Sequence, residues 1–75
     1  MKKNESYPYV IFTGQTKKDL YPVSVAKTKE EAISYAKSLA LLGKVKPEHT
    51  CAEAVYMPED DDDINEVVWS NCGRK

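Results

Sequence analysis

The stretch that decides the fold is residues 28–43, Thr-Lys-Glu-Glu-Ala-Ile-Ser-Tyr-Ala-Lys-Ser-Leu-Ala-Leu-Leu-Gly. It begins with a capping box, in which the Thr28 side chain can accept from the Glu31 amide while Glu31 reaches back to the Thr28 amide. Apolar residues then recur at helical spacing, and Gly43 suits a left-handed helix end. The sequence therefore predicts one helix over about residues 29–42, with alanines that let it lie close against a sheet.

Two strand-like segments precede this helix and two follow it, over residues 7–13, 20–26, 50–57 and 64–70. The first is aromatic and β-branched with apolar side chains on both faces, which favours a central strand. The second alternates with period two, which predicts a half-buried strand with Tyr21, Val23 and Val25 on one face. Pro22 favours an edge position for that strand because its nitrogen cannot donate to a ladder.

The helix reverses the chain between the two pairs of strands. Placing the third strand beside the first gives the spatial order 2-1-3-4, with all neighbours antiparallel. The alternative order 1-2-3-4 needs a right-handed parallel crossover between the second and third strands. We prefer the former because it places Pro22 on an edge. The prediction is an α+β fold of ββαββ order, with one helix on one face of a four-stranded antiparallel sheet.

The length of 75 residues predicts a single domain over residues 1–75, with flexible tails at 1–6 and 71–75. A chain this short has a small core, around which a deep enzymatic cleft is hard to build. We expect no signal peptide and no membrane span. The two cysteines, Cys51 and Cys72, are too few for a disulfide-rich secreted domain, so we predict free thiols in a cytoplasmic protein. Cys51 is interpreted as a small buried hydrophobe and Cys72 as exposed.

The net charge of −1 is unevenly distributed. Residues 1–50 carry nine Lys against five acids, a balance of +4, and residues 51–75 carry two cations against seven acids, a balance of −5. The asymmetry could make a dipolar surface that steers partners by sign. Alternatively, the two regions fold next to each other and partly cancel.

Pro58 is followed by five consecutive carboxylates, Glu59, Asp60, Asp61, Asp62 and Asp63. Five adjacent charges cannot all be buried, so this run is expected to form a solvated loop between the third and fourth strands. One interpretation is a docking surface for a partner's Arg/Lys patch, with Glu66 and Trp69 nearby. The alternatives are a loop that only aids solubility, and a core position for Trp69.

Alternate carboxylates also resemble the start of a calcium-binding loop. Counting from Asp61, the sixth position of an EF-hand must be glycine and is Glu66, while the twelfth should be a bidentate glutamate and is Cys72. We therefore reject an EF-hand and predict no metal site and no cofactor. Weak binding of Ca²⁺ or Mg²⁺ to the acidic run stays open.

Two other groups of residues suggest alternative functions. Lys17, Lys18, Lys44 and Lys46, with exposed Tyr7 and Tyr9, could bind single-stranded nucleic acid, although the acidic balance argues against it. Cys51 and His49 could share a strand face as a thiol and its base, but no third group is identifiable. The sequence thus predicts a small non-enzymatic protein-interaction or regulatory module, and it leaves the oligomeric state open.

Overall fold

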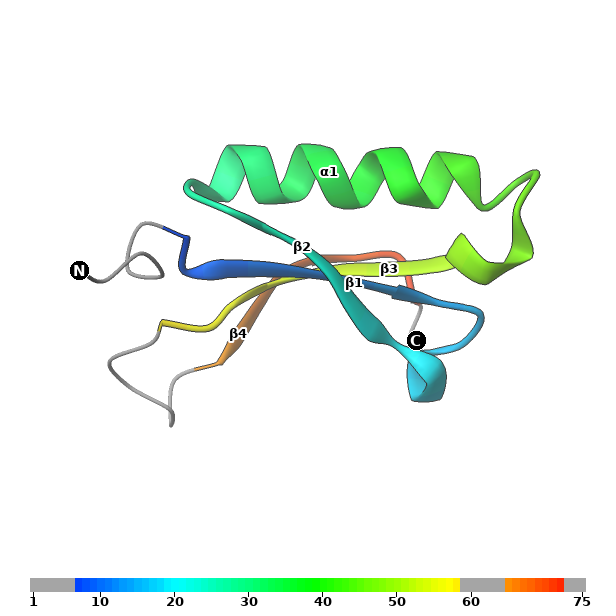
Figure 1. Ribbon diagram of the computed structural model, residues 1–75, viewed down its shortest axis with the longest axis horizontal. Coiled ribbons are helices and arrows are strands. Elements are labelled where there is room, and N and C mark those ends of the chain that lie inside the picture. Colours follow the sequence, from blue (N-terminus) through cyan, green and yellow to red (C-terminus); the bar gives the residue numbers. More distant parts are fainter. Residues whose placement is uncertain (1–6, 59–64, 73–75) are drawn as a thin grey trace.

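The computed structural model describes residues 7–58 and 65–72. A four-stranded antiparallel sheet has the order β2-β1-β3-β4, and one helix lies across one of its faces (Figure 1). The predicted fold class and the preferred strand order are confirmed. The elements are β1 (Tyr9–Gly14), the 3₁₀ turn η2 (Lys17–Asp19), β2 (Tyr21–Ala26), α1 (Lys29–Leu42), the 3₁₀ turn η3 (Pro47–His49), β3 (Cys51–Tyr56) and β4 (Glu66–Ser70).

The helix α1 has the predicted bounds, and both of its ends differ in detail from the prediction. Thr28 Oγ1 accepts from the Glu31 amide at 3.1 Å, but Glu31 Oε1 accepts from the Lys27 amide at 3.3 Å rather than from that of Thr28. The predicted left-handed end is wrong, because Gly43 has φ −61° and ψ −16°. Glycine is required there by close approach: a Cβ would lie 2.6 Å from the carbonyl oxygen of His49.

Small side chains form most of the core between α1 and the sheet. Ala32 and Ala36 of the helix are fully buried, as is Ile11 of β1, the largest aliphatic side chain of the core cluster. Alanine on both sides of the interface lets the helix approach the sheet closely, as the sequence predicted. Tyr35, the only aromatic residue of α1, lies outside this core and is 44% exposed.

A bulge in β2 changes which of its side chains are covered. Ser24 is paired with Ile11 and Pro22 with Phe12, so Val23 has no partner on β1. The predicted half-buried face is wrong: Tyr21, Val23 and Val25 are 43%, 37% and 50% exposed. Only the last residue of the strand, Ala26, is buried.

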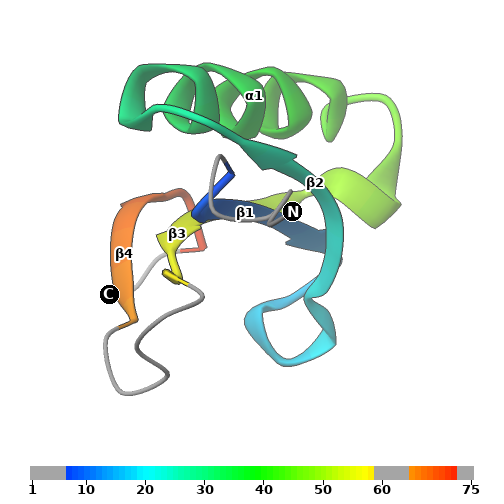
Figure 2. The same cartoon turned by 60° about the vertical axis from the view of Figure 1, so that its left-hand side comes forward.

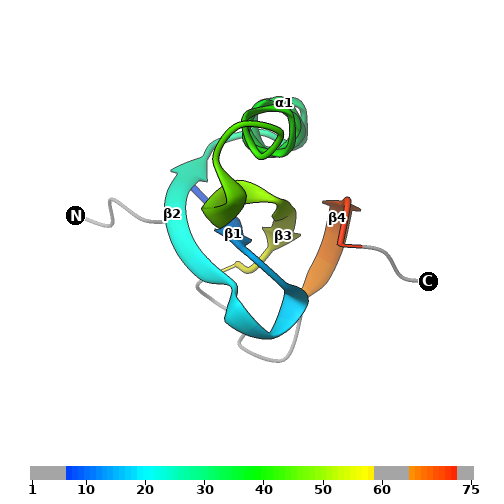
Figure 3. The ribbon, with the colours of Figure 1, turned by 90° about the vertical axis from the view of Figure 1, so that its right-hand side faces the viewer.

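The face of the sheet away from α1 is also covered along β3. Cys51, Glu53 and Val55 alternate with the alanines that face the helix, and they are only 4%, 6% and 8% exposed. Figures 2 and 3 show the reason, since β2 and β4 curve away from the helix on either side of the central strands. The far face of β3 therefore lies in the concave side of a strongly curved sheet.

Candidate interaction surfaces

The acidic run Glu59–Asp63 lies outside the described residues, but both strands that it connects are described. β3 and β4 are antiparallel neighbours, and their last registered pair is Tyr56 with Glu66. The Met57 amide still donates to the Pro8 carbonyl at 2.8 Å. The two ends of the acidic connection are therefore fixed to the sheet.

Glu66 and Trp69 are the two predicted partner-binding residues that the structure describes. Their register partners on β3 are Tyr56 and Ala54, two residues apart, because a bulge adds Val68 to β4 between them. Strict alternation would have put Glu66 and Trp69 on opposite faces, whereas the bulge puts both on the side that faces α1. Glu66 is exposed there, and Trp69 is half-buried and packs against the core cluster.

Trp69 also lines a groove between α1 and β4, of about 420 Å³. The helix contributes Lys37, Ala40 and Leu41 to this groove. Leu41 is 65% exposed, which is unusual for a leucine in a small domain, so one wall of the groove is apolar and open to solvent. The groove ends at Lys44, so its charge is positive rather than negative.

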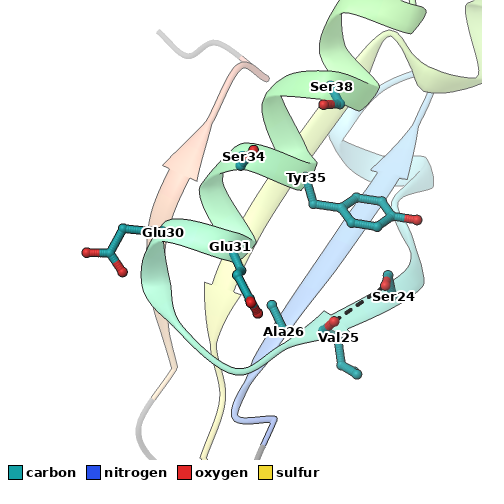
Figure 4. A pocket seen from close by; sticks show the side chains of 8 residues that line it. All are labelled: Ser24, Val25, Ala26, Glu30, Glu31, Ser34, Tyr35 and Ser38. Carbon is teal, nitrogen blue, oxygen red and sulfur yellow. Dashed lines mark hydrogen bonds between the residues drawn. The ribbon is translucent and has the colours of Figure 1, made fainter.

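A second groove, of about 600 Å³, lies between α1 and β2 (Figure 4). The Tyr35 side chain extends over the strand toward Ser24, and the Glu31 carboxylate points toward Ala26. Its polar lining consists of hydroxyls and carboxylates, in contrast to the lysines of the first groove. The helix is thus flanked by two grooves of opposite charge.

The four lysines of the nucleic-acid hypothesis lie at one end of the sheet. Lys17 and Lys18 belong to η2, directly after β1, and Lys44 and Lys46 lie between α1 and η3. The tyrosines expected to accompany them are elsewhere. Tyr9 begins β1 and packs on Tyr56, with ring centroids 5.0 Å apart, while Tyr7 lies under the Lys27 ammonium at 5.7 Å.

The cysteines form a disulfide, Cys51–Cys72, with a Cα–Cα distance of 4.9 Å. The prediction of two free thiols is wrong. Cys51 stands two residues before Glu53 on β3, and Cys72 two residues after Ser70, the partner of Glu53 on β4, so the two cysteines face each other across the ladder. This arrangement removes the thiol–histidine pair considered from the sequence. His49 instead has its Nδ1 3.4 Å from Thr13 Oγ1.

Within residues 7–58 and 65–72, no cluster of three or more His, Cys, Asp or Glu side chains could hold a metal ion. No helix in this part of the chain has the length and apolar character of a membrane span. Comparisons with protein-family models, with curated proteins and with solved structures found no match.

Proposed function

We propose that the protein is a small non-enzymatic interaction or regulatory module that presents residues 59–63 to a partner with a basic patch. The observation that supports this proposal is the pairing of β3 with β4, which fixes both ends of a connection carrying five consecutive carboxylates. A charged segment anchored at both ends loses less conformational freedom on binding than a free tail. Glu66, exposed at the first position of β4, adds a further negative charge beside it.

Trp69 has a smaller part in this proposal than the acids. Its side chain lies on the α1 side of β4 and contributes to the core, so it supports the position of the strand that follows the acidic run. Partner contact through Trp69 would involve only the part of the ring that is open to the groove beside Lys37 and Leu41.

Nucleic-acid binding is the second candidate, and the grouping of Lys17, Lys18, Lys44 and Lys46 at one end of the sheet favours it. Two observations weigh against it. The expected stacking residues Tyr7 and Tyr9 lie at the far end of β1, and the net charge is −1. Fluorescence anisotropy with a single-stranded oligonucleotide at low salt would test it, and we expect no binding.

A cytoplasmic location remains part of the proposal. The disulfide is the feature that tests it, because reducing compartments keep such cysteine pairs as thiols. The disulfide weighs against this location. In a cytoplasmic protein an alkylating agent would modify both cysteines in a fresh extract of the source cells without added reductant. Resistance to alkylation would place the protein in an oxidising compartment instead.

The acidic-run proposal is tested with two variants of equal charge. A partner captured from the source extract is titrated against the wild type, against Asp61→Asn/Asp62→Asn, and against the control Asp19→Asn/Glu48→Gln, whose two acids are exposed in the 3₁₀ turns η2 and η3. Each charge-assisted contact is worth about 1 kcal/mol or more, so we expect the first variant to bind about tenfold or more weakly. The control, which changes two exposed acids outside the acidic run, should bind as the wild type does. Equal affinities for all three proteins, or affinity that does not change with salt, would contradict the proposal.

A further inference from the structure

The flank of α1 beside β4 carries a stripe that is complementary to itself. Its residues are spaced three or four positions apart along α1 and the turn that follows it, where the Lys44 amide donates to the Leu41 carbonyl, and this spacing places the helical members on one side of α1. We call this stripe the β4-side flank, and it consists of Glu30, Ile33, Lys37, Leu41 and Lys44. The groove beside β4 and a second, shallow groove on the surface of α1 share Lys37 and Leu41, so the stripe is continuous over about four turns.

The order of charges along this flank is asymmetric. Glu30 stands at its first end and Lys44, two residues past the last residue of α1, at its other end, and each is seven positions from Lys37. Neither Glu30 nor Lys44 makes an ion pair with another residue of 7–58 or 65–72, where the recorded pair is Lys17 with Glu53. An occupant that satisfies both charges must carry a cation at one end and a carboxylate at the other.

A second copy of this chain, with its helix antiparallel to the first, supplies that pattern. In an antiparallel pair centred on Lys37, Glu30 of one copy faces Lys44 of the other at both ends. Between these charged pairs, Ile33 of each copy faces Leu41 of the other. Leu41 is 65% exposed in the single chain and would be covered in both copies of the dimer. We propose that the β4-side flank is a homodimer interface with twofold symmetry about Lys37, packed at the shallow crossing angle of antiparallel helices.

The same geometry places one unfavourable contact at the centre. The two Lys37 side chains meet at the twofold axis, where like charges repel. Their long aliphatic stems can pack while the ammonium groups turn outward, so the contact weakens the dimer without preventing it. The central contact distinguishes this dimer from a general apolar contact, because removal of the Lys37 charge should strengthen association.

The interface does not depend on the proposed acidic-run function, because it uses no residue of 59–63. Dimerisation would bring two acidic connections into one particle and increase avidity for a partner with repeated basic patches. A variant that stays monomeric and still binds the basic partner would separate the two proposals.

Sedimentation equilibrium of the full chain tests the interface. We expect the wild-type mass to rise from 8.5 kDa toward twice that value as concentration increases to about 1 mM, the weak end of measurable association. Lys44→Glu and Glu30→Lys should each weaken the dimer about tenfold, because each change creates two repulsive contacts by symmetry. The double variant should recover to within about threefold of the wild type.

Matched controls change the same charges away from the flank. Lys18→Glu and Glu48→Lys should associate as the wild type does, and Lys37→Gln should associate about threefold more tightly. Circular dichroism confirms that each variant retains its helix. A wild-type mass that stays at 8.5 kDa at about 1 mM would overturn the proposal and leave the groove for an unlike partner. A double variant as weak as either single one would overturn the antiparallel pairing.

Discussion

The two edges of the sheet are alike in exposure and different in how they are held. β2 and β4 each pair with one neighbour, and each carries a half-exposed valine, Val25 at 50% and Val67 at 51%. Each also contains one bulge. Backbone pairing alone would therefore give both edges similar stability.

Within residues 7–58 and 65–72, side-chain bonds link the β4 edge, and not the β2 edge, to its neighbouring strand. Asn71, directly after β4, accepts from the Ala52 amide at 2.7 Å and donates from Nδ2 to the Thr50 carbonyl at 3.0 Å. Cys72 is bonded to Cys51 one position further on. The corresponding feature of β2 is local: Ser24 Oγ donates to the Val25 carbonyl at 3.4 Å, within the same strand. The comparison indicates that β4 is held to β3 by covalent and polar side-chain contacts. At β2, Pro22 instead limits backbone pairing of the open edge with another strand.

Loss of the disulfide should have the largest effect on this difference. The bond joins residues 21 positions apart, and closing a loop of that size restricts the unfolded chain by about 3 kcal/mol in the chain-entropy model. We expect Cys72→Ser to lower the free energy of unfolding by about this amount. Urea denaturation followed by the fluorescence of Trp69, the chain's only tryptophan, measures it.

The reduced wild type is the control for that variant. Dithiothreitol should lower the stability of the wild type to that of Cys72→Ser and leave the variant unchanged. If the reductant has no effect on a protein shown by mass to be oxidised beforehand, the disulfide contributes nothing to stability. The proposed difference between the edges would then rest on Asn71 alone.

Asn71→Ala should have the second largest effect. The substitution removes two hydrogen bonds and leaves the amide of the fully buried Ala52 without its side-chain partner, which costs about 2 kcal/mol. The matched control is Asn65→Ala, which removes the same group from an exposed position just before β4. We expect the control to change stability by less than about 0.5 kcal/mol. Equal losses in the two variants would show that the Asn71 contacts do not hold the edge.

The parts of the fold that were predictable depend on local chemistry. The capping box at Thr28 and the single proline of the second strand were enough to place α1 and to put β2 on an edge. The two bulges were not predictable, because an extra residue such as Val23 is defined only by its partner strand. A glycine after a helix predicts a left-handed end, whereas Gly43 is needed because η3 returns close to the end of the helix.

The disulfide could have been predicted from the topology that the sequence supported. Once the third and fourth strands are antiparallel neighbours, a cysteine at the start of one and another just past the end of the other approach each other. The number of cysteines alone gives no sign of this pair, which follows from the register of the two strands. The common side of Glu66 and Trp69, in contrast, depends on the bulge at Val68 and had no sequence signal.

The smallest effects should come from the two contacts of Glu53, a buried carboxylate that is 6% exposed. On the β4 side Ser70 Oγ donates to it at 3.1 Å, and on the opposite side Lys17 Nζ lies 3.9 Å away with its side chain 69% exposed. Ser70→Ala should cost about 1 kcal/mol because a buried acceptor loses its donor. Lys17→Gln should cost less than about 0.5 kcal/mol, since solvent screens that pair. Urea denaturation of the oxidised protein measures both changes in the free energy of unfolding. A larger loss of stability for Lys17→Gln than for Ser70→Ala would contradict the conclusion that side chains hold the β4 edge more firmly than the β2 side.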